Sequence, residues 1–101
     1  MKQILIKNLE QIRSLCVEHR VTRLDVFGSV LTDAFTPKSD IDFVVHFHRD
    51  SDTNAFRQYF ELKEALEDIL DCQVDLVCGN SIRNAVFRDT VNASSIPLFA
   101  A

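Results

Sequence analysis

The stretch FGSVLTDAFTPKSDIDFVV, residues Phe27–Val45, decides the fold because it joins a glycine turn to the clearest strand of the chain. In IDFVVHF, apolar residues occupy every second position, and this alternation predicts a strand with one buried face. The opposite face begins with Asp40 and Asp42, whose carboxylates leave the strand about 7 Å apart. Upstream, the run VTRLDVF predicts another strand over about residues 22–27, which ends in a turn at Gly28.

The other segments predict helices around a small sheet. Helical spacing predicts an amphipathic helix up to about residue 20 and another after the loop HRDSDTN, whose Asp52, Thr53 or Asn54 would cap it. CQVDLVC predicts a third strand, GNSIRNAVFRDTVN a last helix, and the tail SSIPLFA is apolar enough to pack. We therefore expect an α/β (α+β) fold, with a mixed sheet of three to four strands flanked by helices, in a single domain spanning residues 1–101.

Composition excludes several classes of protein. The net charge of -4 argues against direct contact with nucleic acid or an anionic membrane. The amino-terminal stretch MKQILIKNLEQIRSLCVEHR mixes charges among its apolar residues, as neither a signal peptide nor a membrane span does, so a cytoplasmic location is expected. The 3 cysteines lack Cys-x-x-Cys spacing, which favours core thiols over a disulfide framework or a zinc site.

The aspartates are the candidate chemical groups. Two unpaired carboxylates at Asp40 and Asp42 would repel each other unless a cation neutralised them, and carboxylate oxygens suit Mg²⁺. Asp75 lies between apolar residues of the third predicted strand, where an aspartate needs a partner. If the two strands are neighbours, three carboxylates converge, as a two-metal phosphoryl-transfer site requires. Gly28 and Ser29 would then offer backbone N–H groups and a hydroxyl to phosphate oxygens.

This pattern resembles a known signature. Gly28-Ser29, ten residues, Asp40-x-Asp42 and a later strand aspartate resemble the nucleotidyltransferases of the polymerase-beta-like superfamily. The length, SDIDFVV and VDLV are most similar to the minimal nucleotidyltransferase (MNT) proteins, which are often antitoxin partners of HEPN-domain toxins. The resemblance implies ATP as donor, two Mg²⁺ ions, and transfer of AMP to a hydroxyl with release of pyrophosphate.

The resemblance also implies a role for each matching residue. It makes Asp40, Asp42 and Asp75 metal ligands, and it places Asp75 near the acceptor hydroxyl as its base. Gly28 and Ser29 become phosphate-binding residues. Ser39 is a further candidate phosphate contact because it adjoins the aspartate pair.

One departure keeps other functions open. Many relatives carry Ala-Arg-Gly after Gly-Ser, whereas this chain has Val-Leu-Thr-Asp and lacks that arginine. The favoured function is AMP transfer to a HEPN-type partner. The alternatives are an antitoxin that neutralises its partner by contact alone, and a subunit that modifies a small molecule of the aminoglycoside type. Homo- or hetero-oligomers are compatible with all three.

Several other residues are expected to have structural roles. Asp25 is predicted to be an edge or surface residue rather than a further ligand. His46 and His48 share one strand face and are predicted to be wall or surface residues. The aromatic series Phe56, Tyr59 and Phe60 is expected to belong to the core or to a surface for a partner helix.

Overall fold

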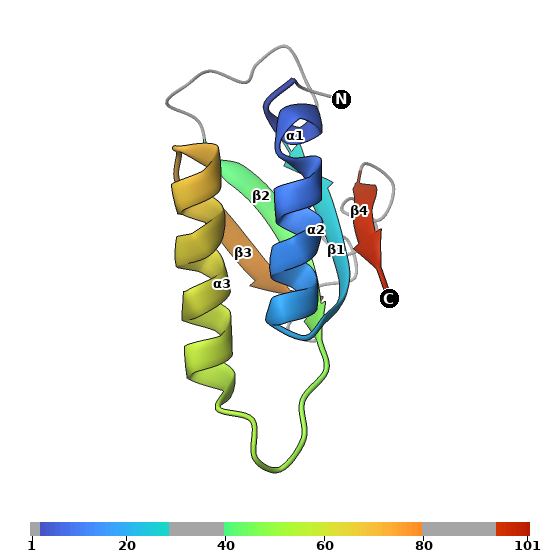
Figure 1. Ribbon diagram of the computed structural model, residues 1–101, viewed down its shortest axis with the longest axis vertical. Coiled ribbons are helices and arrows are strands. Elements are labelled where there is room, and N and C mark those ends of the chain that lie inside the picture. Colours follow the sequence, from blue (N-terminus) through green and yellow to red (C-terminus); the bar gives the residue numbers. More distant parts are fainter. Residues whose placement is uncertain (1–2, 29–39, 80–94) are drawn as a thin grey trace.

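The computed structural model describes residues 3–28, 40–79 and 95–101 of the chain (Figure 1). These ranges contain both helices and strands. In chain order the elements are α1 (Gln3–Lys7), α2 (Leu9–Glu18), β1 (Val21–Phe27), β2 (Ile41–Phe47), α3 (Ala55–Leu70), β3 (Val74–Cys78) and β4 (Ile96–Ala100). The predicted last helix falls within residues 80–94, outside the described residues.

The strands form one mixed sheet in the order β3-β2-β1-β4. β1 pairs antiparallel with both β2 and β4, whereas β2 and β3 are parallel. This confirms the prediction of a small mixed sheet. The fourth strand comes from the apolar tail, which was predicted only to pack, and its Pro97 is tolerated because β4 is an edge strand in the described part of the sheet.

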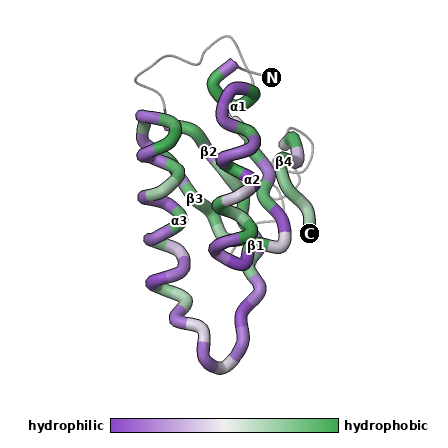
Figure 2. The backbone as a smooth tube through the Cα atoms, viewed as in Figure 1, coloured by the Kyte–Doolittle hydropathy of each residue, from purple (hydrophilic) through white to green (hydrophobic). Residues whose placement is uncertain are grey.

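The three helices of the described residues lie on one side of the sheet (Figure 1). The strand face beneath them is apolar because of the alternation seen in the sequence, and Ile41, Phe43 and Val45 of β2 are fully buried. Leu62 and Leu66 of α3 join the same core. Figure 2 shows the result as hydrophobic colouring along the strands and hydrophilic colouring along the loop between β2 and α3.

The predicted amino-terminal helix is broken at Asn8, which corrects the prediction of one continuous helix. The side-chain Nδ2 of Asn8 donates to the carbonyl oxygen of Ile4 at 2.8 Å. Such a local bond competes with the backbone pattern of a helix and separates α1 from α2. The apolar stripe nevertheless continues across the break, since Leu5 and Ile12 are both fully buried.

Helix α3 begins at one of its three predicted caps. The side chain of Asn54 accepts a hydrogen bond from the backbone N–H of Arg57 at 3.0 Å. The aromatic residues of this helix are distributed differently from its leucines, because Phe56 and Phe60 remain 73% and 42% exposed and only Tyr59 packs against the core. Of the two roles expected for this series, Phe56 and Phe60 therefore fit a surface.

No helix in the described part of the chain is both long enough and apolar enough to cross a membrane.

Candidate active site

Asp42 and Asp75 face each other across the parallel pair β2–β3. Their Cα atoms are register partners, and the flanking pairs, Ile41 with Val74 and Phe43 with Leu76, are buried beneath the helices. Because side chains alternate along a strand, both aspartates point to the face of the sheet opposite α1, α2 and α3. The sequence predicted this convergence on the condition that the two strands are neighbours, and the condition is met.

The electrostatics of Asp42 show that its neighbours are acidic. Its carboxyl pKa is raised above the usual value by burial first, and then by the negative charges of Asp75 and Asp40. The charges of Asp75 and Asp40 are therefore close enough to oppose the ionisation of Asp42. A bound cation reverses that opposition, because it favours the ionised form of the Asp42 carboxyl.

Gly28 closes the site from the end of β1. Its φ of 82° lies in the left-handed region, which favours glycine. A Cβ atom built on Gly28 would collide with Oδ2 of Asp42, so the backbone at Gly28 lies directly against that carboxylate. The neighbouring register pair, Phe27 with Asp42, connects the two strands at this point.

The structure thus brings together Gly28, Asp42 and Asp75, with Asp40 immediately before β2. Ser29 and Ser39, the other two predicted site residues, lie outside the described residues. Among residues 3–28, 40–79 and 95–101, no three Asp, Glu, His or Cys side chains are grouped closely enough to surround a metal ion. Mg²⁺ does not require such a cage, because it keeps several waters and is bound by one or two carboxylates together with substrate phosphates.

Asp25 occupies a different place from the one predicted. It lies in β1, between β2 and β4, and is only 6% exposed. Arg23, two residues earlier on the same strand, donates from Nε to both carboxylate oxygens, at 3.2 and 3.0 Å. The prediction of an edge or surface position is therefore wrong; the ion pair provides the partner that a buried aspartate needs.

His46 lies on the same face of β2 as Asp42 and is half-buried. Its imidazole ring occupies the space where a Cβ at Gly79 would sit. The ring therefore packs against the end of β3, in keeping with the predicted wall role. His48 is exposed beyond the end of β2.

Two contacts to β3 were not predicted from the sequence. The hydroxyl of Tyr59 donates to the carbonyl oxygen of Leu76 at 2.6 Å, and the backbone N–H of Val74 donates to Oε2 of Glu67 at 3.1 Å. Helical spacing indicates only that Tyr59 and Glu67 lie on α3. The strand atoms that they reach depend on how α3 packs over β3.

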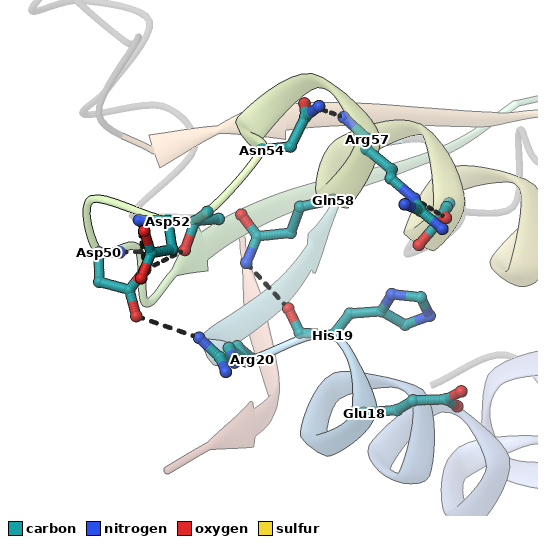
Figure 3. A pocket seen from close by; sticks show the side chains of 10 residues that line it. Glu18, His19, Arg20, Asp50, Asp52, Asn54, Arg57 and Gln58 are labelled. Carbon is teal, nitrogen blue, oxygen red and sulfur yellow. Dashed lines mark hydrogen bonds and ion pairs between the residues drawn. The ribbon is translucent and has the colours of Figure 1, made fainter.

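An open, polar pocket of about 570 Å³ lies at the other end of the sheet (Figure 3). Two ion pairs lie in it, Arg20 with Asp50 at 3.3 Å and Arg57 with Glu61 at 2.7 Å. Arg20 precedes the start of β1, whereas Gly28 follows its end, so the pocket is remote from the aspartates. Because both of its arginines are engaged in ion pairs, this pocket is a poorer candidate for phosphate chemistry.

Comparison with known proteins identifies the family of this chain. A family model described as "Polymerase beta, Nucleotidyltransferase" matches residues 10–101. The chain belongs to this family. This nucleotidyltransferase is also 31% identical, over 95% of its length and 92% of the relative's, to a protein of Methanocaldococcus jannaschii provisionally named a protein adenylyltransferase.

Solved structures similar to this nucleotidyltransferase agree with the family assignment. A protein provisionally named a minimal nucleotidyltransferase has a TM-score of 0.76 and 32% identity, covering 92% of this chain and 91% of its own. The structure of tri-AMPylated HEPN toxin of Shewanella oneidensis in complex with MNT antitoxin has a TM-score of 0.66 and 26% sequence identity. The match covers 95% of this chain and 72% of the chain in that structure. A toxin–antitoxin structure with AMP-PNP has a TM-score of 0.71 and 28% sequence identity. The match covers 93% of this chain and 74% of the chain in that structure. The predicted polymerase-beta-like core and the resemblance to MNT proteins are confirmed.

Proposed function

We propose that this protein is an adenylyltransferase that moves AMP from ATP to a hydroxyl group on a HEPN-type toxin partner, and thereby acts as its antitoxin. The observation that carries this proposal is the register pairing of Asp42 with Asp75, directly beside the backbone of Gly28. Relatives solved with an AMPylated toxin and with AMP-PNP support the same acceptor class and the same donor.

Each residue has a defined task in this reaction. Gly28 lets the triphosphate approach the backbone closely, since it has no side chain, and Ser29 and Ser39 are proposed as further phosphate contacts. Asp75 accepts the proton of the acceptor hydroxyl. The hydroxyl oxygen then forms a bond to the α-phosphorus, and the bond from that phosphorus to the pyrophosphate oxygen breaks.

We propose two Mg²⁺ ions as cofactors. Asp40, Asp42 and Asp75 would hold them, because Mg²⁺ prefers carboxylate oxygens and because burial, and then the negative charges of Asp75 and Asp40, raise the pKa of Asp42. When bound, Mg²⁺ neutralises phosphate charge and stabilises the attacking and leaving oxygens. The missing Ala-Arg-Gly arginine makes this neutralisation more important here.

The acceptor is proposed to be a protein and not a small molecule. Asp75 is exposed on the terminal strand of the described sheet, so a docked protein can bring its own hydroxyl to it. The open pocket described above lies at the other end of the sheet, and Asp75 does not line it, so it offers no site for a small acceptor such as an aminoglycoside beside Asp75. We propose that the protein and its partner meet in the cytoplasm as a hetero-oligomer.

The test uses a HEPN-type toxin as the candidate partner. The purified pair is incubated with ATP and Mg²⁺, and the intact mass of the partner is measured. The proposal expects the partner to gain the mass of AMP with the wild type and with Asp50→Asn, an exposed aspartate of the remote pocket, but not with Asp42→Asn.

The missing arginine favours one other function, neutralisation by contact alone. That function expects a stable complex and loss of toxicity without any gain in mass. Equal protection from toxicity by the wild type and Asp42→Asn, with no adduct on the partner, would replace the proposed transfer by the contact mechanism.

A further inference from the structure

The strand that carries Asp75 is short and lies at an edge. β3 has five residues, and the order β3-β2-β1-β4 leaves its outer side without a strand neighbour in the described part of the sheet. An edge strand presents unpaired N–H and C=O groups on that side. Among the described strands, β3 is therefore paired with β2 alone, and this strand positions Asp75.

Helix α3 supplies the missing hydrogen bonds. Val74 and Leu76 are two residues apart, so their backbone groups point to the same side of β3. The Val74 N–H donates to Glu67 Oε2 at 3.1 Å, and the Leu76 carbonyl accepts from the Tyr59 hydroxyl at 2.6 Å. These two bonds lie immediately before and after Asp75.

The side chains of Tyr59 and Glu67 are both packed in place, so they can hold β3 through these hydrogen bonds. Tyr59 is half-buried against the core, and its ring also contacts Phe60 edge-to-face at 4.9 Å between centroids. Glu67 is half-buried and lies two turns further along the same helix. The pair therefore connects β3 to a rigid 16-residue helix at two points.

We propose that Tyr59 and Glu67 are positioning residues for Asp75, which together replace a neighbouring strand on the open edge of β3 and hold the carboxylate opposite Asp42. The inference rests on the proposed function for the role of Asp75 in transfer. Register matters at this edge because a shift of β3 by one residue would turn Asp75 toward the core face.

The variants separate the two bonds from general packing. Tyr59→Phe keeps the ring and removes only the hydroxyl. Glu67→Leu removes the acceptor for the Val74 N–H, whereas Glu67→Gln keeps an acceptor oxygen. The matched control is Thr22→Val. It deletes a hydroxyl that donates to the carbonyl oxygen of His46 at 3.1 Å, a strand contact far from Asp75.

The measurements are the kcat and the KM for ATP in the AMP-transfer assay, with thermal unfolding recorded for every variant. Tyr59→Phe and Glu67→Leu are expected to lower kcat about tenfold while the KM for ATP stays within about twofold, as for loss of an outer partner that orients a site residue. Glu67→Gln and Thr22→Val are expected to keep the wild-type kcat. A fall in kcat with Thr22→Val as large as that with Tyr59→Phe would overturn the inference. Such a fall would show that kcat depends on the general stability of the protein and not on the bonds to β3.

Hydrogen exchange at β3 distinguishes failure of this inference from failure of the proposed function. Amides of Val74–Cys78 are expected to exchange faster in Tyr59→Phe and Glu67→Leu than in the wild type or Thr22→Val. If the wild type transfers no AMP but this difference is found, the positioning role stands and the proposed function fails. If exchange and kcat are both unchanged in the two variants, the positioning role is wrong whether or not AMP is transferred.

Discussion

The carboxylate of Asp42 lies where a Cβ atom on Gly28 would sit. β1 and β2 are paired at this point, so neither the backbone of Gly28 nor Asp42 can withdraw without disturbing the sheet. The contact explains why glycine is required at the end of β1, and it connects the predicted phosphate corner to the predicted acidic site.

Gly28→Ala tests this contact. The new Cβ meets the Asp42 carboxylate, and φ is 82°, so we expect a loss of about 2 kcal/mol in the free energy of unfolding together with loss of ATP binding. The measurements are denaturant unfolding and calorimetric titration of ATP with Mg²⁺. The matched control is Gly79→Ala, whose Cβ meets the His46 ring instead, and which is expected to destabilise without weakening ATP binding by the folded protein. Full ATP binding by Gly28→Ala would show that the corner does not receive phosphate.

Asp42→Asn is expected to stabilise the metal-free protein while removing its activity. The folded-state pKa of Asp42 is raised, by burial first and then by Asp75 and Asp40, so ionisation is more costly in the folded than in the unfolded state. The stabilisation that this raised pKa provides is complete when the pH is below the pKa of Asp42 in the unfolded state. It is lost as the pH rises through the pKa of Asp42 in the folded state. The wild type loses it once the pH exceeds the folded-state pKa, whereas the uncharged asparagine avoids both the burial of a charge and the repulsion.

Thermal unfolding in a chelator measures this effect. At pH 7 we expect a higher Tm for Asp42→Asn than for the wild type, and the difference should shrink as pH falls toward the ordinary aspartate value of 3.8. Asp50 is the control of opposite sign, because hydrogen bonds from the Asp52 backbone and the Thr53 hydroxyl lower its pKa, so Asp50→Asn should not stabilise. A lower Tm for Asp42→Asn at pH 7 would contradict the crowding of carboxylates at this site.

Arg23→Met tests the ion pair of β1. It leaves Asp25, which is 6% exposed, without the guanidinium that contacts both its oxygens, and we expect a loss of about 2 kcal/mol in the free energy of unfolding. The double variant Arg23→Met/Asp25→Asn should recover part of this loss, because no charge then remains buried. Denaturant unfolding of the three proteins checks both expectations, and equal stability of Arg23→Met and the wild type would mean that the pair contributes nothing.

Cys16 is expected to be chemically silent in the folded protein. The thiol is fully buried in the core, and burial raises its pKa to about 12, so almost no reactive thiolate forms below that pH. Alkylation at pH 8 followed by peptide mass analysis should modify Cys16 only after denaturation. Cys78, which is half-buried, serves as the internal comparison. Rapid labelling of Cys16 in the native protein would show that α2 opens away from the sheet.

The period of the apolar residues was sufficient to predict most of the fold. Alternation in β2 correctly placed Ile41, Phe43 and Val45 in the core and Asp42 on the other face. The short strand β4 was harder to predict, because Pro97 removes a backbone donor and weakens a strand pattern. The break at Asn8 was missed because an asparagine side chain bonding to a carbonyl leaves the apolar period unchanged.

The candidate site was predictable because its residues lie at strand ends with fixed spacing. The convergence of Asp42 and Asp75 needed only that β2 and β3 be neighbours. Asp25 was placed wrongly because a polar residue in a strand suggests solvent exposure, whereas its burial depends on Arg23 and on β1 lying in the interior of the sheet. The bonds from Tyr59 and Glu67 to β3 depend on tertiary packing, which periodicity does not encode.

The central claim is that Asp40, Asp42 and Asp75 together hold a divalent cation that a nucleotide shares at the Gly28 corner. The most direct test is calorimetric titration of a non-hydrolysable ATP analogue with Mg²⁺ into the wild type, Asp42→Asn and the control Asp50→Asn. We predict Mg²⁺-dependent binding to the wild type and Asp50→Asn, and at least about tenfold weaker binding to Asp42→Asn. Equally tight binding to Asp42→Asn and the wild type would contradict the claim.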